Sequence, residues 1–514
     1  MFFFVASRVL GLLRDVVISH QFGTTRALDA YFAAFNLPDF IFNVIAGGAL
    51  GSAFIPTFAA ALAQNDPRRA WRLASAVINL AIIFLTAISA ILAIFAPQVV
   101  AATVAQGFAP VDQQLTADYM RWMLITPIVF GVSGIVMGIL NSYQHFVLPA
   151  LAPVLYNAAI IAGAWFLAPT LGVYGLVVGV VAGAFLHLAI QLPLAFYFRF
   201  QISDFRLEMP NLKSEISNLQ SEDVREVVRL MLPRTFGLAA VQINFLVNTI
   251  LASALPAGGI AALSYAWRLM LLPVGVVGQS LGTAVFPTLS SQTARQELDA
   301  FRNTFSIAFR TTLYLTIPAA VGLLVLGAPF IALLFQRGEF TAQSTAETAG
   351  ALQFYAIALF AHSGLEIVTR TFYALHDTMT PVIIGVGAMI VNIVLSIVLI
   401  SPLAQGGLAL ANSIATILEM LILVVILRRR LVDLDTRRIV VSVARILIAS
   451  IAMGVALIVF KNAFASSSAI LLAILGAAIG AAVYFVATLL LQSEEITFVL
   501  TRIKRKIPNL KSEI

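Results

Sequence analysis

The chain has 514 residues, of which 60% are hydrophobic and only 11% charged, and its net charge is +7. This composition excludes an ordinary soluble domain, in which about a quarter of the residues are charged. The absence of cysteine excludes disulfides, thiolate metal sites and cysteine nucleophiles. Apolar runs of about 20 residues recur along the whole length, which predicts an all-α polytopic membrane protein.

The apolar runs predict fourteen membrane-spanning helices. In chain order they are 2–22, 28–63, 71–104, 117–142, 147–168, 171–200, 227–254, 258–291, 305–336, 346–372, 379–400, 404–427, 438–462 and 467–492. Several are longer than a bilayer requires, so we expect them to tilt, to kink at proline or to extend into water.

The positions of lysine and arginine predict how these helices are oriented. With the N-terminus in the cytoplasm, most of the 31 basic residues fall in cytoplasmic loops and helix ends. The opposite side receives Arg26, Arg337 and Lys461. Because basic residues are retained on the cytoplasmic side, this asymmetry predicts an even number of spans with both termini cytoplasmic. The positive charge therefore indicates membrane topology rather than nucleic-acid binding.

An internal repeat divides the chain. Leu37-Pro38 is followed by Gly51 to Phe58, and the similar pair Leu272-Pro273 is followed by Gly282 to Leu289. A fainter match relates Asn157 to Asn392. The two copies lie six helices apart, which predicts two parallel six-helix lobes. The predicted organisation is an N-terminal lobe (1–205), a cytoplasmic linker (206–226), a C-terminal lobe (227–430), and two further helices with a basic tail (431–514).

A seven-residue segment occurs twice, at 210–216 and again at 508–514. We interpret it as a low-complexity insertion in two exposed places rather than as a docking motif.

Ionisable residues lie inside the predicted spans, where each costs at least about 2.5–3.5 kcal/mol unless it faces a wet cavity or a partner. A rise of 1.5 Å per residue places Arg14 about 20 Å from the start of its helix and Arg268 about 15 Å from the start of its own. Both estimates fall near the midplane, one in each lobe. Arginine suits phosphate because its planar fork donates two hydrogen bonds and stays protonated. These two residues predict a site for a multiply charged anion.

Other interpretations remain open for these ionisable residues. Arg14 could pair with Asp15 or Asp39 and only lock helices together. Arg8 lies nearer the cytoplasm, where a snorkelling side chain is equally consistent with the pattern. Asp15 and Asp39 fit counter-ions better than direct substrate contacts.

Several polar residues also fit structural roles. Asp29 and Arg26 could form an end pair or a helix cap. Glu366 lies four residues before Arg370, as expected of an ion pair on one helix. The segment 337–341 is typical of a turn and cap. The five histidines lack metal-ligand spacing, and no phosphate-binding loop indicates ATP hydrolysis.

Taken together, these motifs resemble the lipid II flippase family, MurJ, also called MviN. The stretches that carry the resemblance are Ser7 to Gly11 with Arg14-Asp15, Phe22-Gly23, Asp29 to Phe32, Leu37-Pro38, Ala53 to Pro56, Tyr265 to Met270, Gln336 to Thr341 and Arg370 to Leu375. The resemblance runs from about residue 5 to the last predicted span.

The resemblance implies the multidrug/oligosaccharidyl-lipid/polysaccharide exporter fold, in a bacterial cell membrane. In that fold two six-helix lobes enclose a central cavity, and two extra helices form a groove for the lipid tail. It implies transport of lipid II, an undecaprenyl-diphosphate-linked disaccharide-pentapeptide, from the inner to the outer leaflet by alternating access. A monomeric transporter is expected rather than an enzyme, with no cofactor and no metal. The predicted substrate-binding residues are Arg8, Arg14, Asp15, Asp29, Asp39 and Arg268.

The chain also departs from the family pattern. Phe42, Gly47 and His145 stand where other members often carry charged residues, so we expect a less charged cavity. Asn248 and Asn392 stand where members proposed to bind sodium carry carboxylates, which argues against sodium coupling. Coupling to the membrane potential or to another cation stays open. Compared with other members, we also expect the N-terminus to be about ten residues short.

Three other functions compete with this interpretation. A drug/cation antiporter of the same fold would require an acidic cavity rather than buried arginines. A flippase for another polyprenyl-diphosphate-linked oligosaccharide would use the same anchor chemistry. An enzyme acting on such lipids would require paired carboxylates, a metal cluster or a nucleophile, and the sequence offers none of these in a recognisable pattern.

Overall fold

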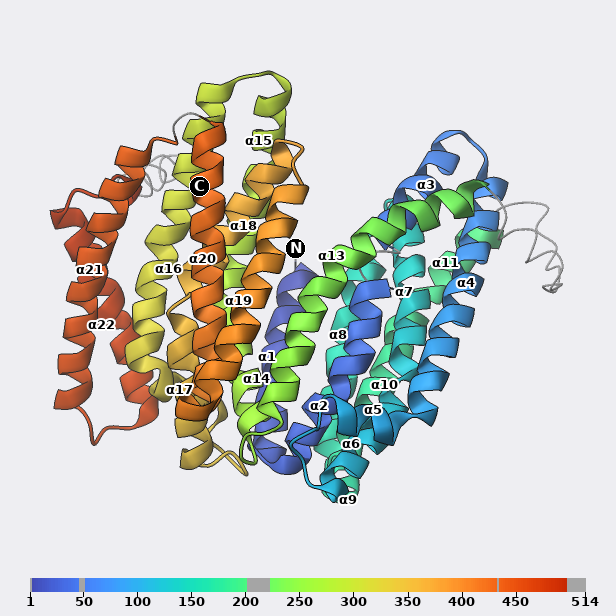
Figure 1. Ribbon diagram of the computed structural model, residues 1–514, viewed down its shortest axis with the longest axis horizontal. Coiled ribbons are helices and arrows are strands. Elements are labelled where there is room, and N and C mark those ends of the chain that lie inside the picture. Colours follow the sequence, from blue (N-terminus) through green and yellow to red (C-terminus); the bar gives the residue numbers. More distant parts are fainter. Residues whose placement is uncertain (1, 46–50, 201–221, 432–433, 497–514) are drawn as a thin grey trace, which may run out of the picture. The chain divides into compact units, whose positions relative to one another are not determined.

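The computed structural model describes residues 2–45, 51–200, 222–431 and 434–496, and within these residues it contains helices and no β-strand (Figure 1). The predicted all-α class is therefore confirmed. In the first half the helices are α1 (Phe2–Phe22), α2 (Arg26–Ile41), α3 (Gly51–Ala63), α4 (Pro67–Ile94), α5 (Ala96–Ala102), α6 (Pro110–Met123), α7 (Ile125–Ser142), α8 (Val147–Ala162), the π-helix η2 (Gly163–Leu167), α9 (Ala168–Leu171), α10 (Tyr174–Ala189), α11 (Leu192–Phe200) and α13 (Glu222–Ala252). In the second half they are α14 (Gly259–Pro273), the π-helix η3 (Val274–Gln279), α15 (Ser280–Ala294), α16 (Leu298–Phe335), α17 (Ala342–Ala356), α18 (Leu359–Ala374), α19 (Met379–Leu403), α20 (Gln405–Arg430), α21 (Thr436–Ala463) and α22 (Ala469–Leu490).

Ten helical segments in the described parts of the chain are long and apolar enough to cross a membrane. The pair α17 and α18, which is bent by 44°, would make eleven if it forms one span. The remaining predicted spans involve α1, α2 with α3, and α13. Helix α1 carries Arg8, Arg14 and Asp15, and in α13 the apolar stretch within the fully described residues is Gln242–Ala252. The chain is thus a multi-pass membrane protein, and the number fourteen stays a prediction.

The helices pack into two compact units. Unit 1 contains the residues up to Ala261 together with Arg337–Phe340, and unit 2 contains Ala262–Gln336 and the residues from Thr341 onward. Helix α13 packs on α2, α3 and α4 and so belongs to unit 1. The two predicted lobes were defined by the internal repeat, whereas the two units are defined by helix packing. The borders of the lobes therefore stay a prediction. Linker residues 206–221 and both copies of the seven-residue segment lie outside the described residues.

Close backbone approach holds the helices of unit 1 together. A Cβ atom added to Gly163 in η2 would lie 2.5 Å from the carbonyl oxygen of Gly175 in α10. Small residues permit such contacts, which drive helix association in lipid. Polar bonds add specificity, because Ser133 Oγ lies 2.7 Å from His187 Nδ1 and accepts a hydrogen bond of 2.9 Å from Gln191 Nε2. This packing holds α7, α8, η2 and α10 together, and α1 packs on α8 and η2.

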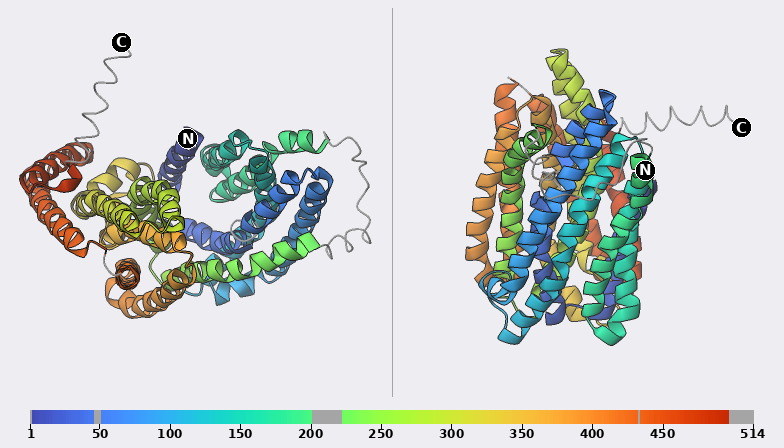
Figure 2. Two further views of the ribbon diagram at one scale, coloured as in Figure 1. Left: turned by 90° about the horizontal axis from the view of Figure 1, so that it is seen from above. Right: turned by 90° about the vertical axis from the view of Figure 1, so that its right-hand side faces the viewer.

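Helix α16, with 38 residues, is the centre of unit 2. It packs against α17 and α18 and also against the pair α21 and α22, which lie beside it (Figure 2). Phe301, Phe305 and Phe309 recur at every fourth position and are buried along one side of α16. By contrast, only 11% of the most apolar 18 residues of α19 are buried. That helix leaves most of its hydrophobic side chains exposed, including Ile383, Ile390 and Ile397.

A salt bridge joins the first turns of α4 and α13 within unit 1, and it predicts a pH-dependent stability. Arg69 Nε donates to Asp223 Oδ2 at 2.8 Å. The hydrogen bond from Arg69 holds the pKa of Asp223 below its usual 3.8. A lowered folded-state pKa contributes stability above the unfolded-state pKa, and this stability is lost as the pH falls through the folded-state value.

We therefore expect the purified protein to melt at a higher temperature than the Asp223→Asn variant at pH 7, with a difference that closes below about pH 4. Thermal unfolding in detergent at several pH values measures this difference. Asp299→Asn is the control, because the side chain of Asp299 is 98% exposed. A difference between wild type and Asp223→Asn that does not change with pH would contradict the assignment.

Candidate substrate-binding site

Arg14 lies in α1 and is held from two directions within unit 1. Its Nε and one terminal nitrogen donate to Asp15 Oδ1 at 3.1 and 3.0 Å. Its other terminal nitrogen donates to Asn157 Oδ1 of α8 at 3.1 Å. The side chain of Arg14 is 20% exposed and that of Asp15 is 7% exposed. The guanidinium is thus shielded from bulk water but remains reachable.

Asn157 fixes the direction in which the guanidinium points. Its amide Nδ2 donates to the carbonyl of Pro153 at 3.0 Å in the same helix, which turns Oδ1 toward Arg14. An arginine has five N–H donors. Three of those of Arg14 are used in the bonds to Asp15 and Asn157, so within the described residues two remain to receive an anionic oxygen. A rigid, partly dehydrated arginine of this kind is suited to phosphate recognition.

Asp29 has a different environment. It is fully buried, and its two oxygens accept hydrogen bonds from the backbone N–H groups of Gly258 at 2.6 Å and Ala261 at 2.8 Å. Arg26 lies 3.6 Å from the same carboxylate. A carboxylate that accepts the first N–H groups of a helix also complements the positive end of its dipole. Asp29 in α2 therefore caps the start of α14, whereas its predicted contact with substrate stays a prediction.

The end of α1 is enclosed by the segment Arg337–Phe340. The N–H of Glu339 donates to the carbonyl of His20 at 2.9 Å, which satisfies a terminal carbonyl of α1. Gly23 adopts φ +55°, and a Cβ atom there would lie 2.2 Å from the carbonyl oxygen of Glu339. The next residue, Thr341, caps α17 by accepting from the N–H of Ser344 at 3.3 Å. The predicted turn and cap are confirmed, but the contact with α1 was not predicted.

The structure does not bring all the predicted residues together. Arg8 is exposed on α1, and Asp39 is half-buried on α2. Arg268 is half-buried on α14 and belongs to unit 2, whereas Arg14 belongs to unit 1. A joint action of Arg14 and Arg268 therefore stays a prediction. In α18 the predicted ion pair between Glu366 and Arg370 is confirmed, and Arg370 also donates to the Glu366 carbonyl at 2.7 Å.

Sequence reasoning missed Asn157 as a partner of Arg14. A signal was present, because the repeat relates Asn157 to Asn392. Both asparagines are buried, and Asn392 accepts a hydrogen bond of 2.9 Å from Ser396. A buried amide at matching positions of two repeats indicates a constrained polar contact.

The profile of the family described as "Lipid II flippase MurJ" matches residues 18–478. The lipid II flippase MurJ of Burkholderia cenocepacia is 31% identical over 434 residues, covering 83% of this chain and 82% of that protein. A probable lipid II flippase MurJ of Haemophilus influenzae is 31% identical over 467 residues, covering 88% and 89%.

The solved structures that resemble this chain include a member of the same family. A lipid II flippase MurJ in an inward closed conformation is similar with a TM-score of 0.80 and 26% identity, over 96% of this chain and 99% of that one. An inward-facing MATE-family multidrug transporter shares the fold, with a TM-score of 0.69 and 16% identity over 84% and 96%. With a profile match over residues 18–478 and two relatives that are 31% identical over more than 80% of both chains, the chain belongs to the lipid II flippase MurJ family.

Proposed function

We propose that this protein transports lipid II across the bacterial cell membrane, from the cytoplasmic to the outer leaflet. The observation that carries the proposal is the position of Arg14, held by Asp15 and Asn157 with two N–H donors left for an anion. Its relatives are lipid II flippases or probable ones. The diphosphate of a polyprenyl-linked sugar presents the paired oxygens that an arginine fork binds.

In the proposed mechanism the headgroup enters from the cytoplasmic side while the lipid tail stays in the bilayer. Arg14 from α1 and Arg268 from α14 bind the diphosphate, and a change of conformation then opens the site to the outer side. Asp15 holds Arg14 in place and lowers the cost of its charge within the membrane. We propose that both termini are cytoplasmic, that the protein acts as a monomer, and that it requires no bound cofactor.

The charge of the substrate suggests an energy source. Moving one elementary charge through 100 mV changes its free energy by about 2.3 kcal/mol. A potential that is negative inside favours outward movement of an anion. We therefore propose that the membrane potential assists transport, without a dedicated sodium site.

The test is a flipping assay with the purified protein in vesicles that carry fluorescent lipid II. We expect lipid II to change leaflets only in vesicles that contain protein, and faster when the donor side is negative. Another polyprenyl-diphosphate oligosaccharide and a cationic drug serve as competing substrates. Transport of either in place of lipid II would overturn the proposal in favour of that substrate.

A further inference from the structure

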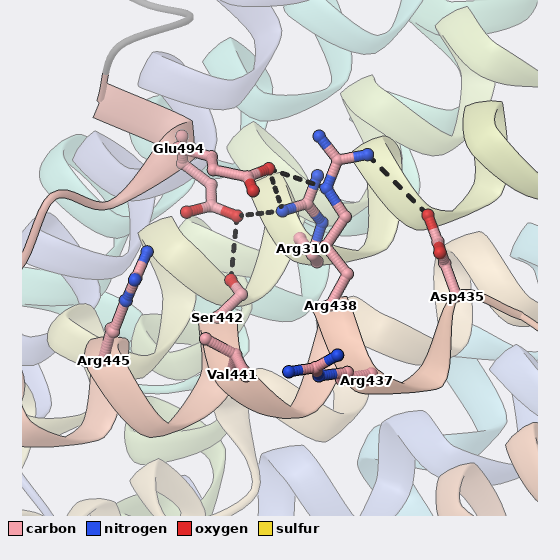
Figure 3. Close-up of a pocket in the computed structure, with 9 residues that line it drawn as sticks. Arg310, Asp435, Arg437, Arg438, Val441, Ser442, Arg445 and Glu494 are labelled. Carbon is pink, nitrogen blue, oxygen red and sulfur yellow. Dashed lines mark hydrogen bonds and ion pairs between the residues drawn. The ribbon is translucent and has the colours of Figure 1, made fainter.

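A polar cavity of about 370 Å³ opens in unit 2, where α16 passes the start of α21 and the segment after α22 (Figure 3). It has no part in the proposed transport site. The residues that line it are Arg310, Asp435, Arg437, Arg438, Val441, Ser442, Arg445, Glu494 and Glu495. Four arginines thus face three carboxylates, which leaves an excess of positive charge.

The carboxylates of the cavity are already engaged. Arg310 lies 2.9 Å from Glu494 and 3.0 Å from Glu495, and Arg438 Nε donates to Glu494 at 2.7 Å. Ser442 donates to Glu495 at 2.8 Å. Burial alone would raise the pKa of Glu494, but the hydrogen bonds from Arg310 and Arg438 hold it below the usual 4.5. These bonds build a rigid wall from three separate segments of the chain.

Cationic groups remain after this pairing. Arg310 is only 4% exposed, and its Nε–H is buried without an acceptor in the described part of the chain. Arg445 donates to the carbonyl of Gln492 at 2.8 Å, which is a neutral acceptor. Arg437 is exposed at the rim. A buried donor without a partner is costly, so the cavity is built to receive a further anionic acceptor.

The surroundings indicate what kind of anion enters. Arg438, Ser442 and Arg445 share one side of α21, three or four residues apart (Figure 3). Helices α21 and α22 can both span a membrane, so their ends lie at the level of the lipid headgroups. Apolar side chains are also exposed in this region: Val441, which lines the cavity, is 43% exposed, and Leu490, four residues before Glu494, is 79% exposed.

We propose that this cavity binds the phosphodiester headgroup of an anionic glycerophospholipid, with the acyl chains lying along α21 and α22. Basic pockets at the ends of membrane helices bind such headgroups. A soluble anion would gain nothing from the exposed apolar side chains of Val441 and Leu490. The lipid would join the α21–α22 pair to α16 by neutralising Arg445 and Arg437.

Titration of phosphatidylglycerol into the purified full-length protein in neutral detergent tests the proposal, with phosphatidylcholine as the comparison. The melting temperature and the lipid retained in native mass spectrometry are the two readouts. We expect phosphatidylglycerol to bind and stabilise the wild type, and the double variant Arg437→Gln/Arg445→Gln to bind it about 10- to 30-fold more weakly.

The control is Arg428→Gln/Arg429→Gln, which removes the same charge from exposed residues at the end of α20. It should bind phosphatidylglycerol like the wild type. The single variant Arg437→Gln changes only an exposed side chain, so it should fold even if the double variant does not. Its phosphatidylglycerol binding should then be weaker than that of the wild type. Equal binding by wild type and Arg437→Gln/Arg445→Gln would overturn the proposal. So would equal stabilisation by phosphatidylcholine, or by soluble glycerol phosphate alone.

Discussion

Replacing Arg14 with alanine is expected to abolish lipid II transport, with flipping reduced by at least about 100-fold. The guanidinium is fixed by Asp15 and Asn157, so alanine removes a positioned donor. Arg268→Ala should have an effect of the same size if both arginines bind the diphosphate. Rescue of a cell depleted of its own flippase and flipping in vesicles both measure the loss.

Two further substitutions separate anion binding from a helix lock. Arg14→Lys keeps the charge but loses the planar fork, so we expect partial activity. Asn157→Ala removes the bond from α8 while the charge of Arg14 remains, so it should reduce transport less than Arg14→Ala. If Asn157→Ala were as damaging as Arg14→Ala, the residue would serve to join α1 and α8.

Arg72→Ala is the matched control, because this arginine is exposed in α4. It should transport like the wild type. The amount of each variant in the membrane fraction must be compared, since loss of Arg14 also leaves Asp15 without a partner. Normal rescue by both Arg14→Ala and Arg268→Ala would refute the proposed anion site.

Asp29→Ala is expected to destabilise the protein by about 3–5 kcal/mol, because it leaves two backbone N–H groups and Arg26 without a buried carboxylate. Using the temperature shift typical of large domains, this corresponds to a melting temperature lower by about 10 °C. Asp29→Asn retains one acceptor oxygen, so its melting temperature should lie between those of the wild type and Asp29→Ala. Thermal unfolding in detergent checks the series.

Asp299→Ala is the control for this series, since it removes an exposed carboxylate from the first turn of α16. The series also distinguishes the two roles considered for Asp29. A cap predicts a lowered melting temperature together with any loss of transport. If Asp29→Ala melts like the wild type but does not transport, Asp29 acts on the substrate and the cap contributes little.

Much of the helical architecture could be predicted because its signals are local. The first predicted span, 2–22, coincides with α1, and the span predicted at 379–400 begins with α19 at Met379. An apolar run of bilayer length is helical wherever it lies, because unpaired backbone groups are too costly in lipid. The pair Glu366–Arg370 was predictable for a similar reason, since four residues make one turn.

The contacts that build the site were harder to predict from the sequence. Arg14 meets an amide 143 residues further along the chain, and Asp29 meets N–H groups 229 and 232 residues away. No propensity or period links such positions, because the pairing follows from how the helices pack. Asp29 occurs near the start of its own helix, where a local cap was the natural expectation. The structure shows instead that Asp29 caps α14, which begins near the C-terminal end of the sequence of unit 1.

The membership of unit 1 has a mechanical consequence. The chain passes from one unit to the other near residue 261, within α14, and again on either side of Arg337–Phe340. Both borders are anchored by hydrogen bonds within unit 1: Asp29 accepts from the N–H of Ala261 at the first, and the carbonyl of His20 accepts from the N–H of Glu339 at the second. A substitution at either anchor would therefore loosen a border of unit 1 without removing Arg14 or Arg268.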